Sequence, residues 1–232
     1  MRAETSGERT RERSPDGVRP GAPRRLRAHA YNGGMHSGGG PVREDASEAV
    51  LLALYLRQAL GLRSPEELPS LRGVARLEPQ RTDDEQALLE RQWREYWAMT
   101  VEPQAHPSPV PLALVDGFDT LVALPADGAR QLREAIRPLA AEAVRYAQDA
   151  HAAYLARAAD APASRSYAGA IAQHERQAGR PAHPFELTVQ VLPLAQRGLW
   201  WIGSLTVAVT DGLREDVAAF DTAIRPIIAE LA

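Results

Sequence analysis

The sequence contains no cysteine and no lysine, so all 27 of its basic residues are arginine. Without cysteine there is no disulfide bond, no thiolate zinc site and no thiol nucleophile. Without lysine, mechanisms that need a lysine Schiff base or the lysine of a phosphate-binding P-loop are excluded. The excess of arginine and alanine is typical of a GC-rich coding sequence, and we infer a bacterial source.

Long apolar segments are also missing. The longest apolar run, residues 49–56, is far shorter than the roughly 18 residues that a membrane helix needs. The arginine-rich start is not followed by an apolar stretch, which argues against a secretory signal peptide. Together with the ordinary hydrophobic content of 44%, these features predict a cytoplasmic protein that does not enter a membrane.

Charge is distributed unevenly along the chain. Residues 1–40 hold eight arginines against four acidic residues, a net charge of +4, whereas residues 41–232 carry a net charge of −7. The first segment is rich in Arg, Gly, Pro and Ser, which predicts a disordered tail. It could be a basic arm for nucleic acid, or a nonfunctional leader that precedes a start at Met35. We predict that residues 41–232 form a single globular domain.

The most regular apolar pattern lies near the C-terminus. Apolar and polar residues alternate in 185–192, and residues 199–209 are rich in β-branched and aromatic side chains, so both segments are predicted strands. The short polar connection between them predicts an antiparallel hairpin. Apolar residues then recur at helical spacing from Leu213 to Leu231, which predicts an amphipathic helix packed on the hairpin.

Earlier segments carry signals of the same kinds. Residues 47–60 are apolar around most of a helical circumference, and residues 82–100 begin with a Thr-Asp-Asp-Glu capping box. A helical pattern over residues 127–159 should break at Pro138. Residues 112–124 contain two apolar runs around Asp-Gly, which predicts a second hairpin.

The two predicted hairpins lead into similar segments. A strand, Asp-Gly and a helix with Ala-Ile-Arg-Pro occur in residues 121–138 and again in 206–226. The match is either an internal duplication or a coincidence in an alanine- and arginine-rich chain. A duplication would pair two hairpin-plus-helix units into one antiparallel sheet of about four or more strands, with several amphipathic helices packed on it. The predicted fold class is therefore α+β.

Complete catalytic, metal-binding and phosphate-binding motifs are missing. There is no His-x-x-x-His pair, no Gly-x-Ser-x-Gly elbow and no glycine-rich loop after a strand. His151, His174 and His183 could converge in the fold, but three unrelated surface histidines explain them as well. Asp116 and Asp119 could serve acid–base chemistry, but Asp-Gly is also ordinary turn chemistry. We predict no catalytic residue, no metal site and no cofactor.

The adjacent tryptophans Trp200 and Trp201 are the local feature that points to binding. Consecutive strand residues face opposite ways, so one ring should be in the core while the other faces solvent, a partner or a pocket. Exposed tryptophan is common at binding hot spots. The candidate binding residues are therefore Trp200, Trp201 and the preceding Arg197, with His183 just before the first strand. If helices cover both faces of the sheet, both rings are buried instead.

We interpret the chain as a non-enzymatic module that binds a protein or a small ligand, with self-association as one form of that binding. One alternative is a hydrolase whose site is assembled from dispersed histidines and aspartates. Another is a nucleic-acid-associated protein that uses the basic tail. The net negative charge of residues 41–232 argues against the second alternative, because it would repel phosphate.

Overall fold

A computed structural model describes residues 42–76, 81–160 and 164–232. The predicted basic tail, residues 1–40, lies outside this described part of the chain. No helix within the described part is both long enough and apolar enough to cross a membrane.

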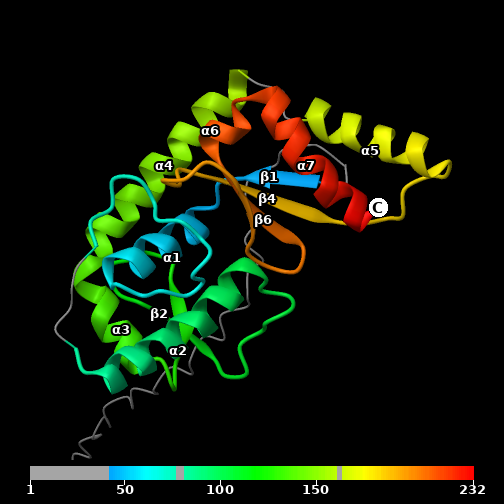
Figure 1. The fold of residues 1–232 in the computed structure, drawn as a ribbon. Helices are drawn as coiled ribbons and strands as arrows, with labels where there is room; N and C mark the ends of the chain where they lie inside the picture. The colour runs from blue at the N-terminus through cyan, green and yellow to red at the C-terminus, as the bar shows by residue number, and fades with distance from the viewer. Residues whose placement is uncertain (1–41, 77–80, 161–163) are drawn as a thin grey trace, which may run out of the picture. The chain divides into compact units, whose positions relative to one another are not determined.

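The main sheet of the described chain is mixed, with its strands in the order β1-β4-β6-β5 (Figure 1). Its first three strands are parallel neighbours, and the short strand β5 is antiparallel to β6 at the edge of the sheet. In the register of the sheet, Val42 lies opposite Leu187 and Thr188 lies opposite Thr206. The strands are β1 (Val42–Asp45), β4 (Leu187–Leu192), β5 (Leu199–Trp201) and β6 (Thr206–Thr210).

This topology corrects the predicted antiparallel sheet. The segments 185–192 and 199–209 do not form a hairpin with each other, because β4 and β6 run parallel. Residues 199–209 are not one strand either: they fold back at residues 202–205, so that the hairpin is formed by β5 and β6. The class α+β holds, but the arrangement of its strands was predicted wrongly.

The proposed pairing of two hairpin-plus-helix units is also wrong. β2 (Leu112–Leu114) and β3 (Ala123–Pro125) do pair antiparallel, but they form a separate two-stranded sheet. The similar segments 121–138 and 206–226 therefore do not meet in one sheet. β1, whose four residues carry little strand signal, occupies the edge next to β4.

The helical predictions are confirmed where the signals were local. The capping box of Thr82 and Glu85 is formed at the start of α2, and the long helical region breaks at Pro138 into α3, a short 3-10 helix and α4. The helices are α1 (Glu48–Ala59), α2 (Asp83–Val101), α3 (Arg130–Ile136), the 3-10 helix η1 (Arg137–Leu139), α4 (Ala140–Asp160), α5 (Ser164–Ala178), α6 (Asp211–Arg214) and α7 (Val217–Leu231).

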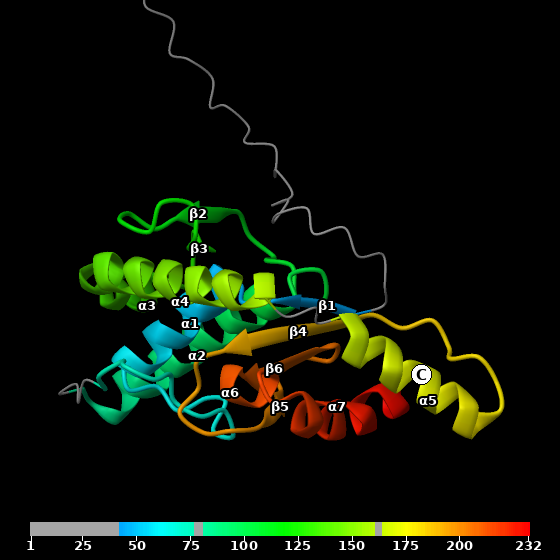
Figure 2. The same cartoon turned by 90° about the horizontal axis from the view of Figure 1, so that it is seen from above.

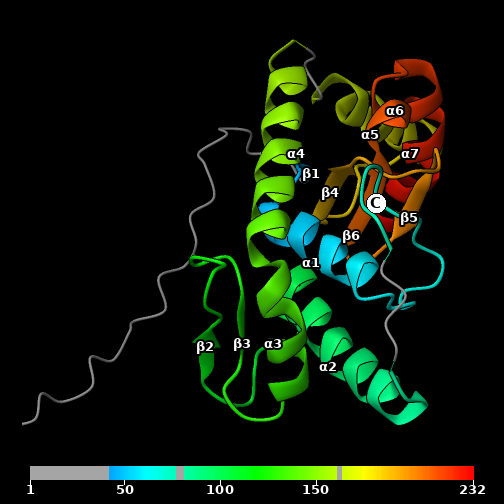
Figure 3. The same cartoon turned by 90° about the vertical axis from the view of Figure 1, so that its left-hand side faces the viewer.

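Helices lie on both sides of the main sheet. Figures 1 and 3 show α5 beside α7 on one side, and α1 with α4 on the other. Figure 2 shows the same elements from above. Strands β4 and β6 are buried almost throughout, as expected for strands covered on both faces. Helix α1 is buried around nearly its whole circumference, which agrees with its continuous apolar sequence.

The turn between β5 and β6 depends on a carboxylate from α2. Glu102, at the C-terminal end of that helix, accepts hydrogen bonds from the Ser204 hydroxyl at 2.6 Å and the Ser204 backbone N–H at 2.7 Å. A third, longer bond comes from the backbone N–H of Leu205. A side chain at Gly203 would collide with Glu102, since a Cβ there would lie 2.6 Å from its carboxyl carbon. The fold-back at residues 202–205 is thus stabilised by a residue about 100 positions away in sequence.

Replacing Glu102 with glutamine should destabilise the protein by about 1 kcal/mol at pH 7, because charge-assisted hydrogen bonds become neutral ones. Burial raises the pKa of Glu102, but the hydrogen bonds from Ser204 and Leu205 together lower it below its ordinary value. A folded-state pKa below the unfolded one adds stability above the unfolded pKa, and this stability is lost as the pH falls through the folded pKa. Urea unfolding of wild type and E102Q should therefore converge as the pH falls through this lowered pKa.

The matched control is Glu95→Gln, on the exposed side of the same helix. It should differ little from wild type at any pH. A difference between wild type and E102Q that does not change with pH would contradict the role assigned to the Glu102 carboxylate.

Candidate functional site

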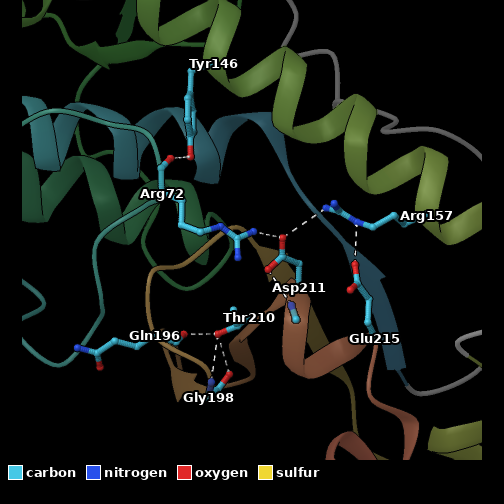
Figure 4. Close-up of polar contacts among 9 residues, drawn as sticks. Arg72, Tyr146, Arg157, Gln196, Gly198, Thr210, Asp211 and Glu215 are labelled. Carbon is cyan, nitrogen blue, oxygen red and sulfur yellow. Dashed lines mark hydrogen bonds and ion pairs between the residues drawn. The ribbon is translucent and has the colours of Figure 1, made fainter.

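The carboxyl ends of the parallel strands carry a cluster of charged groups centred on Asp211. This residue directly follows β6 and is only 4% exposed. Its carboxylate accepts a hydrogen bond from the Arg72 guanidinium and another from the Gly212 backbone N–H at 2.7 Å, and it lies 3.6 Å from Arg157 of α4 (Figure 4). One buried carboxylate thus joins the sheet, the loop that contains Arg72, and α4.

Arg157 extends the cluster to α6, because its guanidinium also lies 3.5 Å from the carboxylate of Glu215 (Figure 4). Both arginines are about half exposed, so each keeps one side in solvent while the other faces Asp211. In open sheets with parallel strands, the crevice outside the carboxyl ends of the strands is the usual place for a ligand. The position of the cluster makes this end of the sheet the first region to search for a site.

A second polar cluster lies next to the first. Arg214 donates to Glu44 of β1 at 2.7 Å, and both side chains are nearly buried. The Tyr167 hydroxyl donates to the same carboxylate. The pKa of Tyr167 is raised, mainly by burial and also by the negative charge of Glu44. Burial alone would lower the pKa of Arg214, but Glu44 raises it, so the guanidinium stays charged. The cavity between the clusters has a volume of only about 50 Å³, which suits ordered water better than an organic ligand.

The loop before β5 is tied to the end of β6 by Thr210. The Thr210 hydroxyl donates to the backbone carbonyl of Gln196 at 2.5 Å and accepts from the Gly198 N–H at 3.1 Å (Figure 4). This places Arg197 beside the start of α7, where it contacts the helix-capping Asp216 at 2.6 Å. These bonds fix the residues that lead into the tryptophan pair.

A larger cleft opens beside the Asp211 cluster, between α1, α4 and the loop after Arg72. Its volume is about 550 Å³, within the range of small-molecule sites. The loop contributes Gly73, Val74 and Ala75. The helices and η1 contribute a mixture of apolar, aromatic and charged side chains: Tyr55, Ala59, Leu139, Glu142, Arg145, Tyr146 and Asp149.

The loop wall of this cleft is held by two residues of α1. The buried guanidinium of Arg57 donates to four backbone carbonyls of the loop, those of Arg63, Pro65, Leu68 and Pro69. The Gln58 side chain accepts from the Leu71 N–H at 2.7 Å and donates to the Val74 carbonyl at 2.5 Å. The irregular backbone of this loop therefore finds its hydrogen-bond partners in side chains of a buried helix.

The same loop is also attached to the sheet and to α4. The Arg72 N–H donates to the Pro193 carbonyl at 2.8 Å, directly after β4. The Arg72 carbonyl accepts from the Tyr146 hydroxyl of α4 at 2.9 Å (Figure 4). Because Arg72 is held through its N–H, its carbonyl and its guanidinium, the adjoining residues 73–75 form a fixed wall.

The residues predicted for binding do not gather in one place. Trp200 is half-buried against the core, and Trp201 is 39% exposed on the edge strand. Arg197 lies at the N-terminal end of α7, whereas the His183 N–H donates to the Ala232 carbonyl at the other end of that helix. The 15 residues of α7 span about 22 Å, so His183 is remote from Arg197.

The residues considered for a hydrolase are likewise dispersed. His151 bonds through Nδ1 to the Ala46 carbonyl at 2.8 Å, and Asp116 lies 3.6 Å from Arg137. His174 is on α5, and none of the three candidate histidines lines either cavity. Within residues 42–76, 81–160 and 164–232, no group of three or more metal-binding side chains is arranged to hold an ion.

Sequence reasoning missed the residues that line the cleft. Their signal was available, because Glu142, Arg145, Tyr146 and Asp149 recur at helical spacing beside the alanine stripe of α4. The helical pattern does not predict which loop packs opposite this face of α4, and the cleft needs both. Comparisons of the sequence and structure with models of protein families, curated proteins and solved structures gave no match.

Proposed function

We propose that this chain is a binding module whose small-molecule site is the cleft between α1, α4 and residues 73–75. The observation that carries the proposal is a cleft of about 550 Å³ whose walls combine two tyrosines, apolar side chains and charges of both signs. The volume is that of a small-molecule site, whereas the lining is more polar than is usual for one, which favours a polar ligand.

The rigidity of the loop wall supports the same proposal. Residues 73–75 directly follow Arg72, which is held by Asp211 and Tyr146, and the Val74 carbonyl accepts from Gln58, so part of the conformational freedom of this wall is already lost before a ligand binds. A preformed site binds more tightly than one that must be ordered by its ligand.

A fragment library screened by protein-observed NMR tests this function. Ligands of the cleft should shift the amide resonances of α1, α4 and residues 73–75 together. Ala75→Trp should abolish these shifts, because Ala75 lines the cleft and an indole there fills it. The matched control is Ala141→Trp, an exposed position of α4 outside the cleft lining, which should bind as wild type does.

The proposal fails if no fragment shifts these resonances. It also fails if the fragments bind A75W as well as they bind A141W, because they would then occupy another surface.

Self-association is a second candidate function, and the exposed end of the β5–β6 hairpin favours it. Trp201 is 39% exposed on the edge strand, and Leu205 in the turn of the same hairpin is 44% exposed. An edge strand offers backbone hydrogen bonds to another chain, and an adjacent tryptophan is the side chain most typical of hot spots. The partner we consider is a second copy of this chain.

Sedimentation velocity over a concentration series tests the hairpin as a self-association surface. Trp201→Ala should weaken dimerisation about thirtyfold, since a hot-spot tryptophan contributes roughly 2 kcal/mol. Val217→Ala, which alters an exposed apolar side chain of α7, is the control and should leave dimerisation unchanged. A chain that stays monomeric at all concentrations, or a W201A variant that dimerises like wild type, would rule out this surface.

A further inference from the structure

Three charged side chains line the cleft from one face of α4. Glu142, Arg145 and Asp149 are three and four residues apart, a spacing that places them on the same side of a helix. None of them forms an ion pair with another residue in the described part of the chain. The cleft therefore offers two carboxylates and one guanidinium to a ligand.

An aromatic pair stands beside these charges. The rings of Tyr55 and Tyr146 lie 5.4 Å apart at an angle of 45°. The Tyr55 hydroxyl donates to Glu142 at 3.1 Å, and the Tyr146 hydroxyl donates to the Arg72 carbonyl, so both rings are held in place. Burial raises the pKa of Tyr146 to about 12, which keeps this phenol a neutral donor at physiological pH.

The remaining lining is apolar or small. Ala59, Val74 and Leu139 contribute side chains without hydrogen-bonding groups. Next to the tyrosine rings they form a surface that suits an apolar portion of a ligand rather than a sugar or a nucleotide phosphate.

We propose, on the basis of the ligand cleft proposed above, that its ligand is a small zwitterion, of which a free amino acid with an aromatic or aliphatic side chain is the simplest form. The ammonium group pairs with Asp149, because Glu142 already accepts from the Tyr55 hydroxyl and lies about 10 Å from Asp149 along the axis of α4. The carboxylate pairs with Arg145, whose planar guanidinium binds a carboxylate through two hydrogen bonds. The apolar side chain packs against Tyr55, Tyr146 and Leu139.

The mixed charge of the lining favours a zwitterion over a ligand that carries only an anionic or only a cationic group. A simple anion would meet two carboxylates for one guanidinium. A simple cation would be attracted by the carboxylates and the tyrosine rings, but it would leave Arg145 unused and beside a like charge. Only a ligand with both groups pairs with charges of both signs in the cleft.

Three matched probes test the inference by isothermal titration calorimetry and NMR titration: phenylalanine, phenethylamine without the carboxylate, and 3-phenylpropionate without the ammonium. Phenylalanine should bind at least about tenfold more tightly than either half-ligand, which corresponds to one charge-assisted pair. Each probe should shift the resonances of α4 and residues 73–75.

Two variants separate the two charged contacts. Arg145→Ala should lower the affinity for phenylalanine about tenfold and leave that for phenethylamine unchanged or higher, while Arg145→Lys should restore part of the loss. Asp149→Asn should weaken phenylalanine and phenethylamine but not 3-phenylpropionate. Arg145 and Asp149 are both exposed, and thermal unfolding of each variant checks that the fold is kept.

Equal binding of the three probes, or an Arg145→Ala variant with wild-type affinity for phenylalanine, would overturn the inference. If phenylalanine does not bind but other fragments occupy the cleft, the zwitterion is wrong while the binding function stands. If neither phenylalanine nor any fragment binds there, both proposals fall.

Discussion

The buried carboxylate of Asp211 is the group on which the arrangement of the candidate site depends. It lies at the end of a central parallel strand and contacts arginines from two other segments, Arg72 of the loop and Arg157 of α4. A carboxylate this deeply buried is stable only when it is paired and hydrogen-bonded. Asp211 therefore needs the two arginines and the Gly212 N–H to stay within contact distance. The same requirement fixes the loop and α4 relative to the sheet, and the cleft lies between them.

A second buried charge, the guanidinium of Arg57, holds an earlier part of the same loop. Its four carbonyl partners belong to a segment without regular secondary structure, whose backbone groups would otherwise need water. Burial lowers the pKa of Arg57, which reflects the cost of removing this cation from solvent. The loop carbonyls offset that cost, so the cation and the loop stabilise each other. Arg57 thus holds residues 63–69, while Asp211 through Arg72 and Gln58 through Val74 hold the wall of the cleft at residues 73–75.

How much of this could be predicted depended on how local each signal was. The start of α2 at Thr82 and the break before α4 at Pro138 follow from a few neighbouring residues, and both were predicted correctly. The pairing of the strands was not, because residues 199–209 alternate like one strand and their reversal is stabilised by Glu102 from α2. The local alternation of apolar and polar residues cannot predict a contact with a residue so far away in the sequence.

The candidate site was predictable only in part, for the same reason. The alternation around Trp200 and Trp201 predicted that the two rings face opposite ways, and the structure places Trp201 at the surface and Trp200 against the core. The cleft needs Tyr55, Val74 and Tyr146 from separate segments, and nothing in the sequence links them. Arg197 and His183 were grouped as candidate binding residues, but the structure places them at opposite ends of α7.

Hydrogen exchange of the Asp211→Asn variant tests the central claim most directly. If Asp211 holds the loop through Arg72, the amides of Leu71 and Arg72, which donate to the Gln58 side chain and the Pro193 carbonyl, should exchange at least about tenfold faster than in wild type, because local opening becomes easier by roughly 1.4 kcal/mol or more. Asp221→Asn, which removes only an i,i+4 pair with Arg225 on α7, should leave these amides unchanged. Unchanged exchange at Leu71 and Arg72 in D211N would contradict the account, because the loop would then be held without the buried carboxylate.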